Sequence, residues 1–457
     1  MMKLTGFDKK KYLNLLRISI LTFIFLSCVT FSSLLEEMDS AVEKDEFTTA
    51  IETIKKAQEK PIALYNEKNA VSLFLDKGLL EHYAGNYAAS SEDLQNAERL
   101  IEEAYAKSIS EGFFIYIIND YSKEYPGEDF ENIYLNIFNA LNYFNRGNTE
   151  GALAEIRKLN MTNGKLDMLA RKYDYVDPKT GVKLNEMARR ETGIWDIPKA
   201  QSVNFSNSAL ARYLSALFYQ AEGNKDSARI EFDQIERAFN ANKNIYQNQI
   251  PTAVEGARNV PGGMARLNII SFTGLSPIKE ETISLQQLPF LHPVLQIATF
   301  RLPGLVRRPG QITRVEAVIE GHKFDLELLE DMGSVVQETY KARYSNILIR
   351  TYIRTIIKYA VADIAAIAAM AADQDEGMNG FLVALAARAA TDASERADIR
   401  MSRYLPEKAY IGGINLNPGT YSVIINYYSG SHIIAHEQRE AVVNTGCLNL
   451  IQTVKLK

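Results

Sequence analysis

The 457-residue sequence is poor in the residues that build metal and cofactor sites. It contains two cysteines, Cys28 and Cys447, together with five histidines and one tryptophan. Two cysteines exclude a disulfide framework, and neither stands at a spacing from histidine that a zinc site requires. The sequence also lacks a glycine-rich phosphate loop and the Gly-x-Ser-x-Gly turn of serine hydrolases. We therefore predict no metal, no cofactor and no catalytic residue.

A surplus of positive charge is missing as well. The formal net charge is −5, and the first 27 residues hold five of the cations and only one anion. An acidic chain without a basic stripe is a poor candidate for binding nucleic acid or for electrostatic adhesion to anionic lipid. One local exception is the cluster of Arg307, Arg308 and Arg314, which could meet an anionic polymer.

Two histidines are close in the sequence, because His432 and His436 are four residues apart and Glu437 follows. On a helix this spacing suits zinc, but the local pattern predicts a strand and a hairpin. In a strand the two positions would lie about 13 Å apart, so we expect solvated hairpin residues. Cys447 is expected to be a small buried residue of a strand, since unpaired cysteine is among the most buried residue types.

The first 28 residues form a targeting pattern. Cations occur up to Arg17, residues 18–27 are an uncharged run, and Cys28 follows. The run is about half of the 20 residues that a membrane-spanning helix needs, so it predicts the apolar part of a signal peptide. An uncleaved short anchor or an ordinary secretion signal is the alternative.

The end of this pattern, Phe25-Leu26-Ser27-Cys28, resembles the lipobox of bacterial lipoproteins. In that class of proteins the cysteine receives a diacylglyceryl group and becomes the first mature residue. The resemblance implies a signal peptide over residues 1–27, a lipidated Cys28 and a location in the bacterial cell envelope. Because Val29 follows the cysteine, the resemblance favours the outer membrane, with the protein facing the periplasm.

Residues 28–260 repeat one helical pattern four times. A turn begins at Asp45, Gly85, Gly147 and Gly223. A small residue follows each turn at the fifth position: Ala50, Ser90, Ala152 and Ala228. An apolar residue follows at the ninth: Ile54, Leu94, Ile156 and Phe232. These offsets are typical of the two-helix tetratricopeptide (TPR) repeat, but the turns are 40, 62 and 76 residues apart instead of about 34. We therefore predict an irregular, TPR-like α-solenoid.

Two insertions, residues 105–132 and 160–207, account for the irregular spacing. Insertions in solenoids gather on one face, so we expect these two, with the groove that the repeats hold open, to form the functional surface. The alternative is that they are extra packing at the ends of the array.

The pattern changes at Val260-Pro261-Gly262-Gly263, where we place a domain boundary. Residues 261–457 alternate as strands do, apart from helices at about 334–398. The Ala-rich run Tyr359–Ala372 is too short for a membrane span and contains Asp363, so it predicts a buried helical hairpin with the helix that follows. The fold class is thus α+β, with a helical domain followed by an antiparallel β domain.

Three further segments support a family assignment: Tyr125-Pro126-Gly127-Glu128-Asp129-Phe130-Glu131, Asn204-Phe205-Ser206-Asn207, and Glu395-Arg396-Ala397-Asp398-Ile399-Arg400 with Leu405-Pro406. From Cys28 to the carboxy terminus, the chain resembles a widespread, functionally uncharacterised family of bacterial TPR-like lipoproteins. It departs from that family at Met401-Ser402-Arg403-Tyr404, where an aromatic residue usually follows Arg-Ser. The resemblance implies an envelope lipoprotein without assigned activity, and some members look associated with lipoproteins that activate cell-wall synthases.

These observations lead to one expected function and one alternative. We expect a lipid-anchored scaffold, not an enzyme, that binds other envelope proteins through its helical repeats during cell-envelope assembly. The alternative is an envelope enzyme or glycan-binding protein that uses the carboxy-terminal β domain. A deep pocket with converging His, Asp or Glu side chains would favour the alternative.

Overall fold

A computed structural model describes most of the chain: residues 33–58, 65–110, 121, 123–170, 205, 207–287, 297–372 and 378–457. The predicted signal peptide (1–27) and Cys28 lie outside the described residues. So do residues 111–120 of the first predicted insertion and 171–204 of the second.

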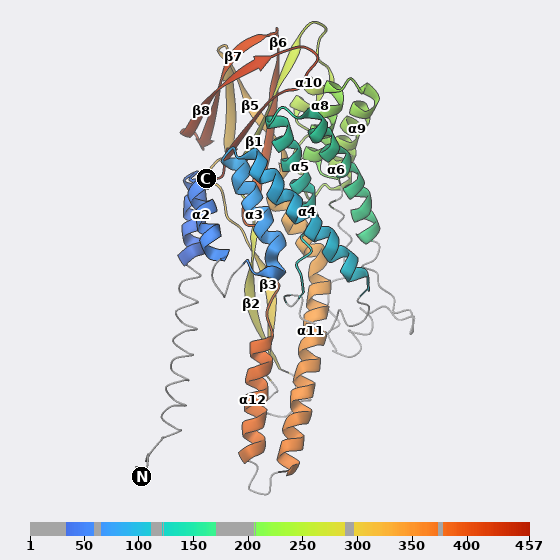
Figure 1. Cartoon of the computed structure of the whole chain (residues 1–457), viewed down its shortest axis with the longest axis vertical. Helices are drawn as coiled ribbons and strands as arrows, with labels where there is room; N and C mark the ends of the chain where they lie inside the picture. Colours follow the sequence, from blue (N-terminus) through green and yellow to red (C-terminus); the bar gives the residue numbers. More distant parts are fainter. Residues whose placement is uncertain are drawn as a thin grey trace, which may run out of the picture.

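Paired helices form the amino-terminal half of the protein (Figure 1). After a helix at residues 33–43, they are α2 (Phe47–Gln58), α3 (Ala70–Tyr83), α4 (Tyr87–Ser110), α5 (Asp129–Asn145), α6 (Thr149–Ala170), α8 (Ala209–Ala221), α9 (Lys225–Ala241) and the short α10 (Thr252–Arg258). Each of the four predicted turns contains a residue with positive φ: Asp45 (61°), Gly85 (81°), Gly147 (73°) and Gly223 (81°). The four turns thus fall where the sequence predicts them.

The helices of each pair cross where the sequence places its small residues. The predicted positions are buried in all four pairs: Ala50, Ser90, Ala152 and Ala228, with Ile54, Leu94, Ile156 and Phe232. One close approach lies between α3 and α4, where a Cβ added to Gly78 would stand 2.8 Å from Leu94 Cγ. Ser90 Oγ also donates a hydrogen bond to the Gly78 carbonyl at 2.6 Å, which fixes the crossing.

Replacing Gly78 with alanine should lower the free energy of unfolding by about 1–3 kcal/mol, because the new methyl group would force Leu94 out of its place. Chemical denaturation of the purified protein measures this loss. Gly262→Ala is the matched control, since nothing lies within 4 Å of the added Cβ there. Equal stability of the two variants would show that the α3–α4 crossing is not tightly packed.

The carboxy-terminal half contains a seven-stranded sheet in the order β8-β7-β4-β5-β6-β1-β9. Its strands are β1 (Ala265–Leu275), β4 (Arg314–Ile319), β5 (His322–Asp331), β6 (Pro406–Leu416), β7 (Gly419–Ser429), β8 (His432–Val443) and β9 (Asn449–Lys455). The sheet is not fully antiparallel as predicted, because β9 runs parallel to β1. This parallel pair places the last strand beside the first strand of the sheet, next to the helical half.

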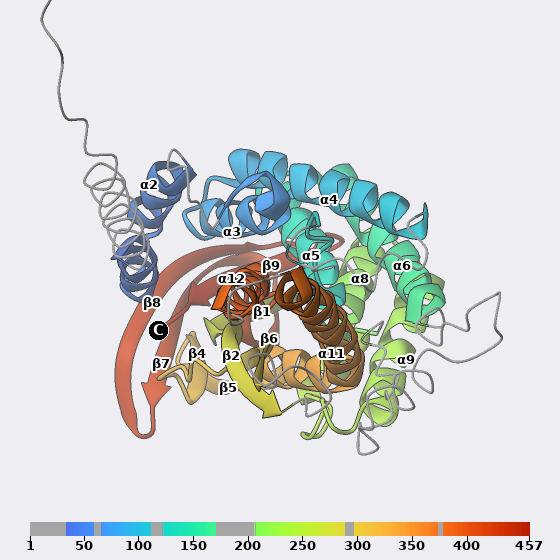
Figure 2. The same cartoon turned by 90° about the horizontal axis from the view of Figure 1, so that it is seen from below.

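The helices and the sheet share one hydrophobic core. Figure 2 shows the helix pairs following one another in an arc, with the sheet on the inner side of that arc. Phe138 of α5 contacts Phe272 of β1, with ring centroids 5.0 Å apart, and the same core extends to Leu329 and Ile411. Every residue of β1 is buried, so both of its faces are covered. The predicted groove between the repeats is therefore filled by the protein's own sheet.

An arm projects from this body (Figure 1). It consists of a two-stranded ribbon, β2 (Ile278–Gln287) paired with β3 (Ile297–Val306), and a helical hairpin, α11 (Met332–Ala372) and α12 (Met378–Ser394). The first turns of α11 remain in the core of the body through Met332, Val335 and Val336. With 41 residues, α11 is about 60 Å long, so most of its length lies in the arm.

Candidate interaction site

In the far half of the α11–α12 hairpin, most of the described side chains are exposed, whether they are small or large. Among its described side chains beyond Tyr359, Ala362 and Ala366 are buried, and Ala362 belongs to a cluster that contains Phe300 of β3. Six large aliphatic side chains are instead 39–68% exposed: Val361, Ile364, Ile367, Leu382, Val383 and Leu385. The prediction of a buried hairpin was therefore correct in secondary structure and wrong in burial. Two helices can pack closely through alanine alone. Larger side chains elsewhere on the same helices then remain exposed to solvent.

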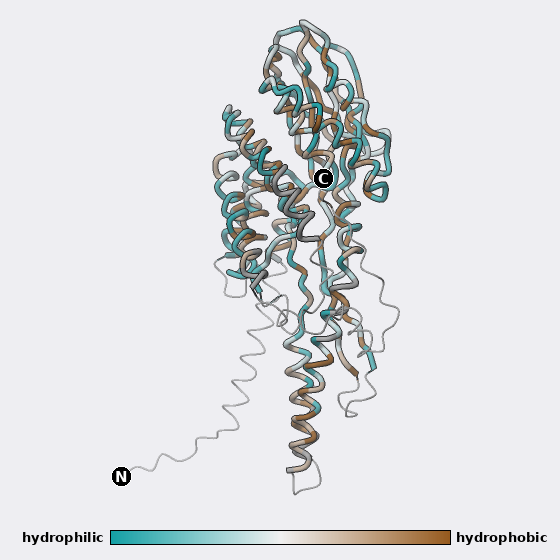
Figure 3. The backbone as a smooth tube through the Cα atoms, turned by 90° about the vertical axis from the view of Figure 1, so that its right-hand side faces the viewer, coloured by the Kyte–Doolittle hydropathy of each residue, from teal (hydrophilic) through white to brown (hydrophobic). Residues whose placement is uncertain are grey.

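We call these six exposed residues (Val361, Ile364, Ile367, Leu382, Val383 and Leu385) the apolar flank. Figure 3 shows hydrophobic residues along both helices of the hairpin up to its far end. The exposed fractions together equal about three whole side chains, so complete coverage would be worth roughly 5–10 kcal/mol. A group of exposed large aliphatic side chains on one projecting element is typical of a contact surface.

The near half of the arm has a conventional core. Phe300 of β3 packs against Tyr352 of α11 with ring centroids 4.3 Å apart, and the Thr299 amide donates to the Tyr359 hydroxyl at 3.1 Å. Arg354 and Lys358 of α11 both pair with the buried carboxylate of Glu395, at 3.0 and 2.5 Å. The ribbon and the two helices are therefore held together before the apolar flank begins.

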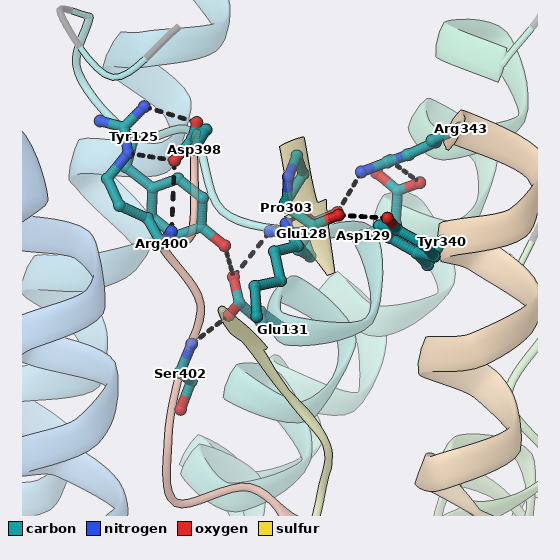
Figure 4. Close-up of polar contacts among 11 residues, drawn as sticks. Tyr125, Glu128, Asp129, Glu131, Pro303, Tyr340, Arg343, Asp398, Arg400 and Ser402 are labelled. Atoms are coloured by element: carbon teal, nitrogen blue, oxygen red, sulfur yellow. Dashed lines mark hydrogen bonds and ion pairs between the residues drawn. The ribbon is translucent and has the colours of Figure 1, made fainter. Parts of the chain in front are cut away.

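A cluster of acidic residues joins the arm to the body (Figure 4). Glu128 and Asp129 begin α5, where the positive end of the helix dipole favours carboxylates. Glu128 pairs with Lys279 of β2 and with Arg343 of α11, and Arg343 also pairs with Asp129. Although burial opposes it, the Lys279 and Arg343 charges hold the pKa of Glu128 below its usual value. One helix terminus thus binds both components of the arm.

The same helix terminus also binds the connector, residues 395–405, which leads from α12 to β6. The Ser402 amide donates to Glu131 Oε1 at 2.5 Å, while the Tyr125 hydroxyl and the Glu128 amide donate to Oε2, each at 2.7 Å. The Arg400 guanidinium lies over the Tyr125 ring, 5.2 Å from its centroid. We call this set of contacts (Tyr125, Glu128, Asp129, Glu131, Lys279, Arg343, Arg400 and Ser402) the polar joint.

The polar joint should make stability depend on pH. Burial raises the pKa of Glu131 from its ordinary 4.5 to about 7, and the Glu128 charge adds to this. The folded state therefore binds this proton more tightly than the unfolded chain, so stability present below pH 4.5 is lost as pH rises to 7. In the Glu131→Gln protein, the free energy of unfolding should fall less between pH 4.5 and pH 7 than in the unaltered protein. Chemical denaturation at a series of pH values measures this difference.

Burial also raises the pKa of Asp76, to about 6, so Asp76 adds to the pH dependence of both the unaltered and the Glu131→Gln protein. The difference between the two proteins in how stability changes with pH therefore reports on Glu131. The exposed Glu280→Gln substitution is the control and should leave the pH dependence unchanged. A slope for Glu131→Gln identical to that of the unaltered protein would contradict the assignment.

Each of the three arginines in the predicted basic cluster has a partner within the protein. Arg308 is half-buried and donates to the Ser276 carbonyl at 2.7 Å. Arg314 stacks on Tyr428 at 3.7 Å from the ring centroid and pairs with Asp325, while Arg307 donates to a glutamine side chain. Whether the cluster meets an anionic polymer stays a prediction.

The cysteine and histidine predictions had mixed outcomes. Cys447 is exposed in the turn before β9, so its predicted burial was wrong. His432 and His436 lie in β8, as the strand pattern predicts, and His432 is exposed. Within the described ranges, no three His, Cys, Asp or Glu side chains come together as metal ligands. His82 is buried against Asn142 and Gln452, and burial lowers its pKa to about 4.

The alternative function requires converging polar groups in the carboxy-terminal half. One small hollow of about 80 Å³ lies beside the sheet, lined by Phe239, Ile245, Tyr246, Gln247, Asn248, Leu328, Leu329, Asp331 and Ser334. Asp331 accepts hydrogen bonds from the amide and hydroxyl of Ser334 and so caps α11. Its carboxylate is therefore already engaged in a structural role.

None of the helices in the described part of the chain combines the length and the apolar character needed to cross a membrane. The comparisons with known proteins add no further constraint, because no family model, no curated protein and no solved structure matches this chain.

Proposed function

We propose that the protein is a lipid-anchored docking scaffold of the bacterial cell envelope that acts by binding other proteins. In this proposal Cys28 carries the lipid and the helix pairs are divergent TPR-like repeats. The recurrent positive-φ turns and the buried small residues at the fifth position support the repeat assignment. Because the sheet covers the inner side of the helices, docking takes place at the arm and not in a groove between repeats.

The single observation that supports this proposal is the apolar flank on a firmly attached arm. A scaffold needs a surface whose coverage by another chain lowers the free energy. That surface also needs a fixed orientation. The flank supplies the first, and the polar joint supplies the second through ion pairs from α5 to both β2 and α11. The arm thus presents its contact surface away from the body.

The docking proposal is tested by introducing charge on the flank. Combining Ile364→Asp with Leu382→Asp should reduce recovery of proteins crosslinked to the chain in cells by at least tenfold, because covering a charged surface is unfavourable. Ile230→Asp is the matched control, since Ile230 is a similarly exposed aliphatic residue on α9. Equal recovery with both proteins would reject docking through the arm.

The anchor is tested separately by metabolic labelling with palmitate. The unaltered protein should incorporate label and remain with membranes, whereas Cys28→Ala should do neither. Equal incorporation by both proteins would rule out lipidation at Cys28, without bearing on the arm.

A further inference from the structure

We infer that β8 is a dimerisation edge, at which β8 of a second copy of this protein pairs antiparallel and joins the two sheets into one. Among the described strands, β8 pairs with β7 alone and forms one end of the sheet (Figure 1). Every second one of its 12 residues therefore directs a backbone amide and carbonyl away from β7, and an edge of this length is a template for another strand. This edge is separate from the arm, so the inference goes beyond the proposed function.

The order of side chains along β8 is self-complementary about Gln438. In a symmetric antiparallel pair, Gln438 lies opposite its own copy, and each residue before it lies opposite the residue equally far after it. The opposing residues then match in charge and in size: Glu437 with Arg439, His436 with Glu440, and Ala435 with Ala441. Opposite charges that face each other on neighbouring strands stabilise the pairing, and the symmetry forms each of these pairs twice.

The side chains that would meet are already placed on one face of the sheet. Glu437 accepts a hydrogen bond from the Tyr427 hydroxyl and pairs with Arg439 of its own strand at 2.9 Å. The Arg439 side chain is 55% exposed, and its guanidinium has further N–H groups that can donate to a second carboxylate. A second copy would therefore complete a closed group in which positive and negative charges alternate.

The same charges disfavour the neighbouring registers. A centre at Glu437 would place this carboxylate opposite its own copy, and a centre at Arg439 would do the same with two guanidinium groups. Like charges directly opposite each other are destabilising. Charged residues on an edge strand usually prevent pairing, whereas on β8 their order favours one register. The bulge of β8, between Ile433 and Ala435, lies outside the paired residues 435–441.

A charge exchange tests the inference on the full chain purified in detergent. Sedimentation should show a dimer. Arg439→Glu should weaken dimerisation at least tenfold, because it places a glutamate opposite Glu437. Combining it with Glu437→Arg exchanges the two charges, recreates the opposite pairs and should restore the dimer. A monomer before substitution, a dimer that Arg439→Glu leaves intact, or a combined variant that stays monomeric would overturn the inference.

Disulfide formation tests the register. Gln438→Cys is introduced in a Cys447→Ser background, and two differently tagged copies are expressed together and treated with oxidised glutathione. Directly opposite residues have Cα atoms about 4.5–5.5 Å apart, which a disulfide can span, so we expect a product that contains both tags. Ser422→Cys is the matched control, because Ser422 is exposed on β7 and would stay at least about 14 Å from its copy.

The products also separate this inference from the proposed function. A product in which Gln438→Cys is joined only to a different protein, or equal amounts of product from Gln438→Cys and Ser422→Cys, would overturn self-pairing of β8. The combined Ile364→Asp and Leu382→Asp substitutions on the arm should leave the dimer unchanged. Loss of the dimer in that variant would place the contact on the arm and would contradict pairing through β8.

Discussion

Replacing Glu128 with alanine should lower the free energy of unfolding by about 3–5 kcal/mol and weaken the attachment of the ribbon to the body. The carboxylate is the common partner of Lys279 on β2 and Arg343 on α11. The Lys279 side chain is 10% exposed, so removal of Glu128 leaves a largely desolvated cation without its ion-pair partner. Because Asp129 still pairs with Arg343, the larger part of the loss should come from the ribbon.

Hydrogen exchange measured by mass spectrometry locates this effect. Exchange in the Glu128→Ala protein should accelerate in β2 and in α11 near Arg343, while β1 remains protected. Glu280→Ala is the control, since Glu280 is an exposed residue of the same ribbon. If exchange in the arm were the same in both variants, the polar joint would not be what holds the arm.

Replacing Glu330 with alanine should cost more, about 4 kcal/mol or above, because several buried donors would lose their acceptor at once. The carboxylate accepts from the hydroxyls of Tyr134, Ser208 and Tyr246 at 2.8–2.9 Å and from the Leu210 amide at 3.3 Å. These donors come from α5, α8 and the segment after α9, whereas Glu330 belongs to β5.

This residue therefore ties the helical half to the sheet, and its loss should lower the melting temperature of both together. The comparison is with Asp325→Ala on the same strand, which removes an exposed ion pair and should cost less than about 1 kcal/mol. Separate melting of helices and sheet in the unaltered protein would contradict a shared core.

Local features were predictable from the sequence because their causes are local. The turns at Gly85, Gly147 and Gly223 need positive φ, which glycine adopts without strain, and the small residues five positions later follow from helix geometry. The change from helix to strand near Pro261 is likewise visible in the sequence. Whether this change marks a boundary between independent domains stays a prediction, although residues from both sides share one core.

The arm was predictable in secondary structure but not in exposure. A run of alanine with scattered Val, Ile and Leu has the same composition whether its outer face meets solvent or protein, and hydrophobicity alone favours burial. Exposure depends on which surface of each helix packs against a neighbouring element. Here Ala362 and Ala366 are buried, whereas Ile364 is exposed. Similarly, Cys447 was assigned to a strand that begins two residues later, at Asn449.

The polar joint could not be derived from spacing in the sequence. Glu128 contacts residues 151 and 215 positions away, and Glu131 contacts Ser402 across 271 positions. The only signal was that Glu128, Asp129 and Glu131 lie in a segment that resembles the lipoprotein family. A row of acids before a helix predicts capping, whereas their partners are set by the tertiary fold.

The accessibility of Ile364→Cys in cells is the most direct test of the claim that another protein covers the apolar flank. In a Cys447→Ser background, the rate of modification by a small maleimide is compared with that of Ile230→Cys, using permeabilised cells and denatured protein as a reference. We predict that Ile364→Cys reacts at least tenfold more slowly than Ile230→Cys in cells and equally fast after denaturation. Equal rates in cells would show that the flank is open to solvent and would contradict this account.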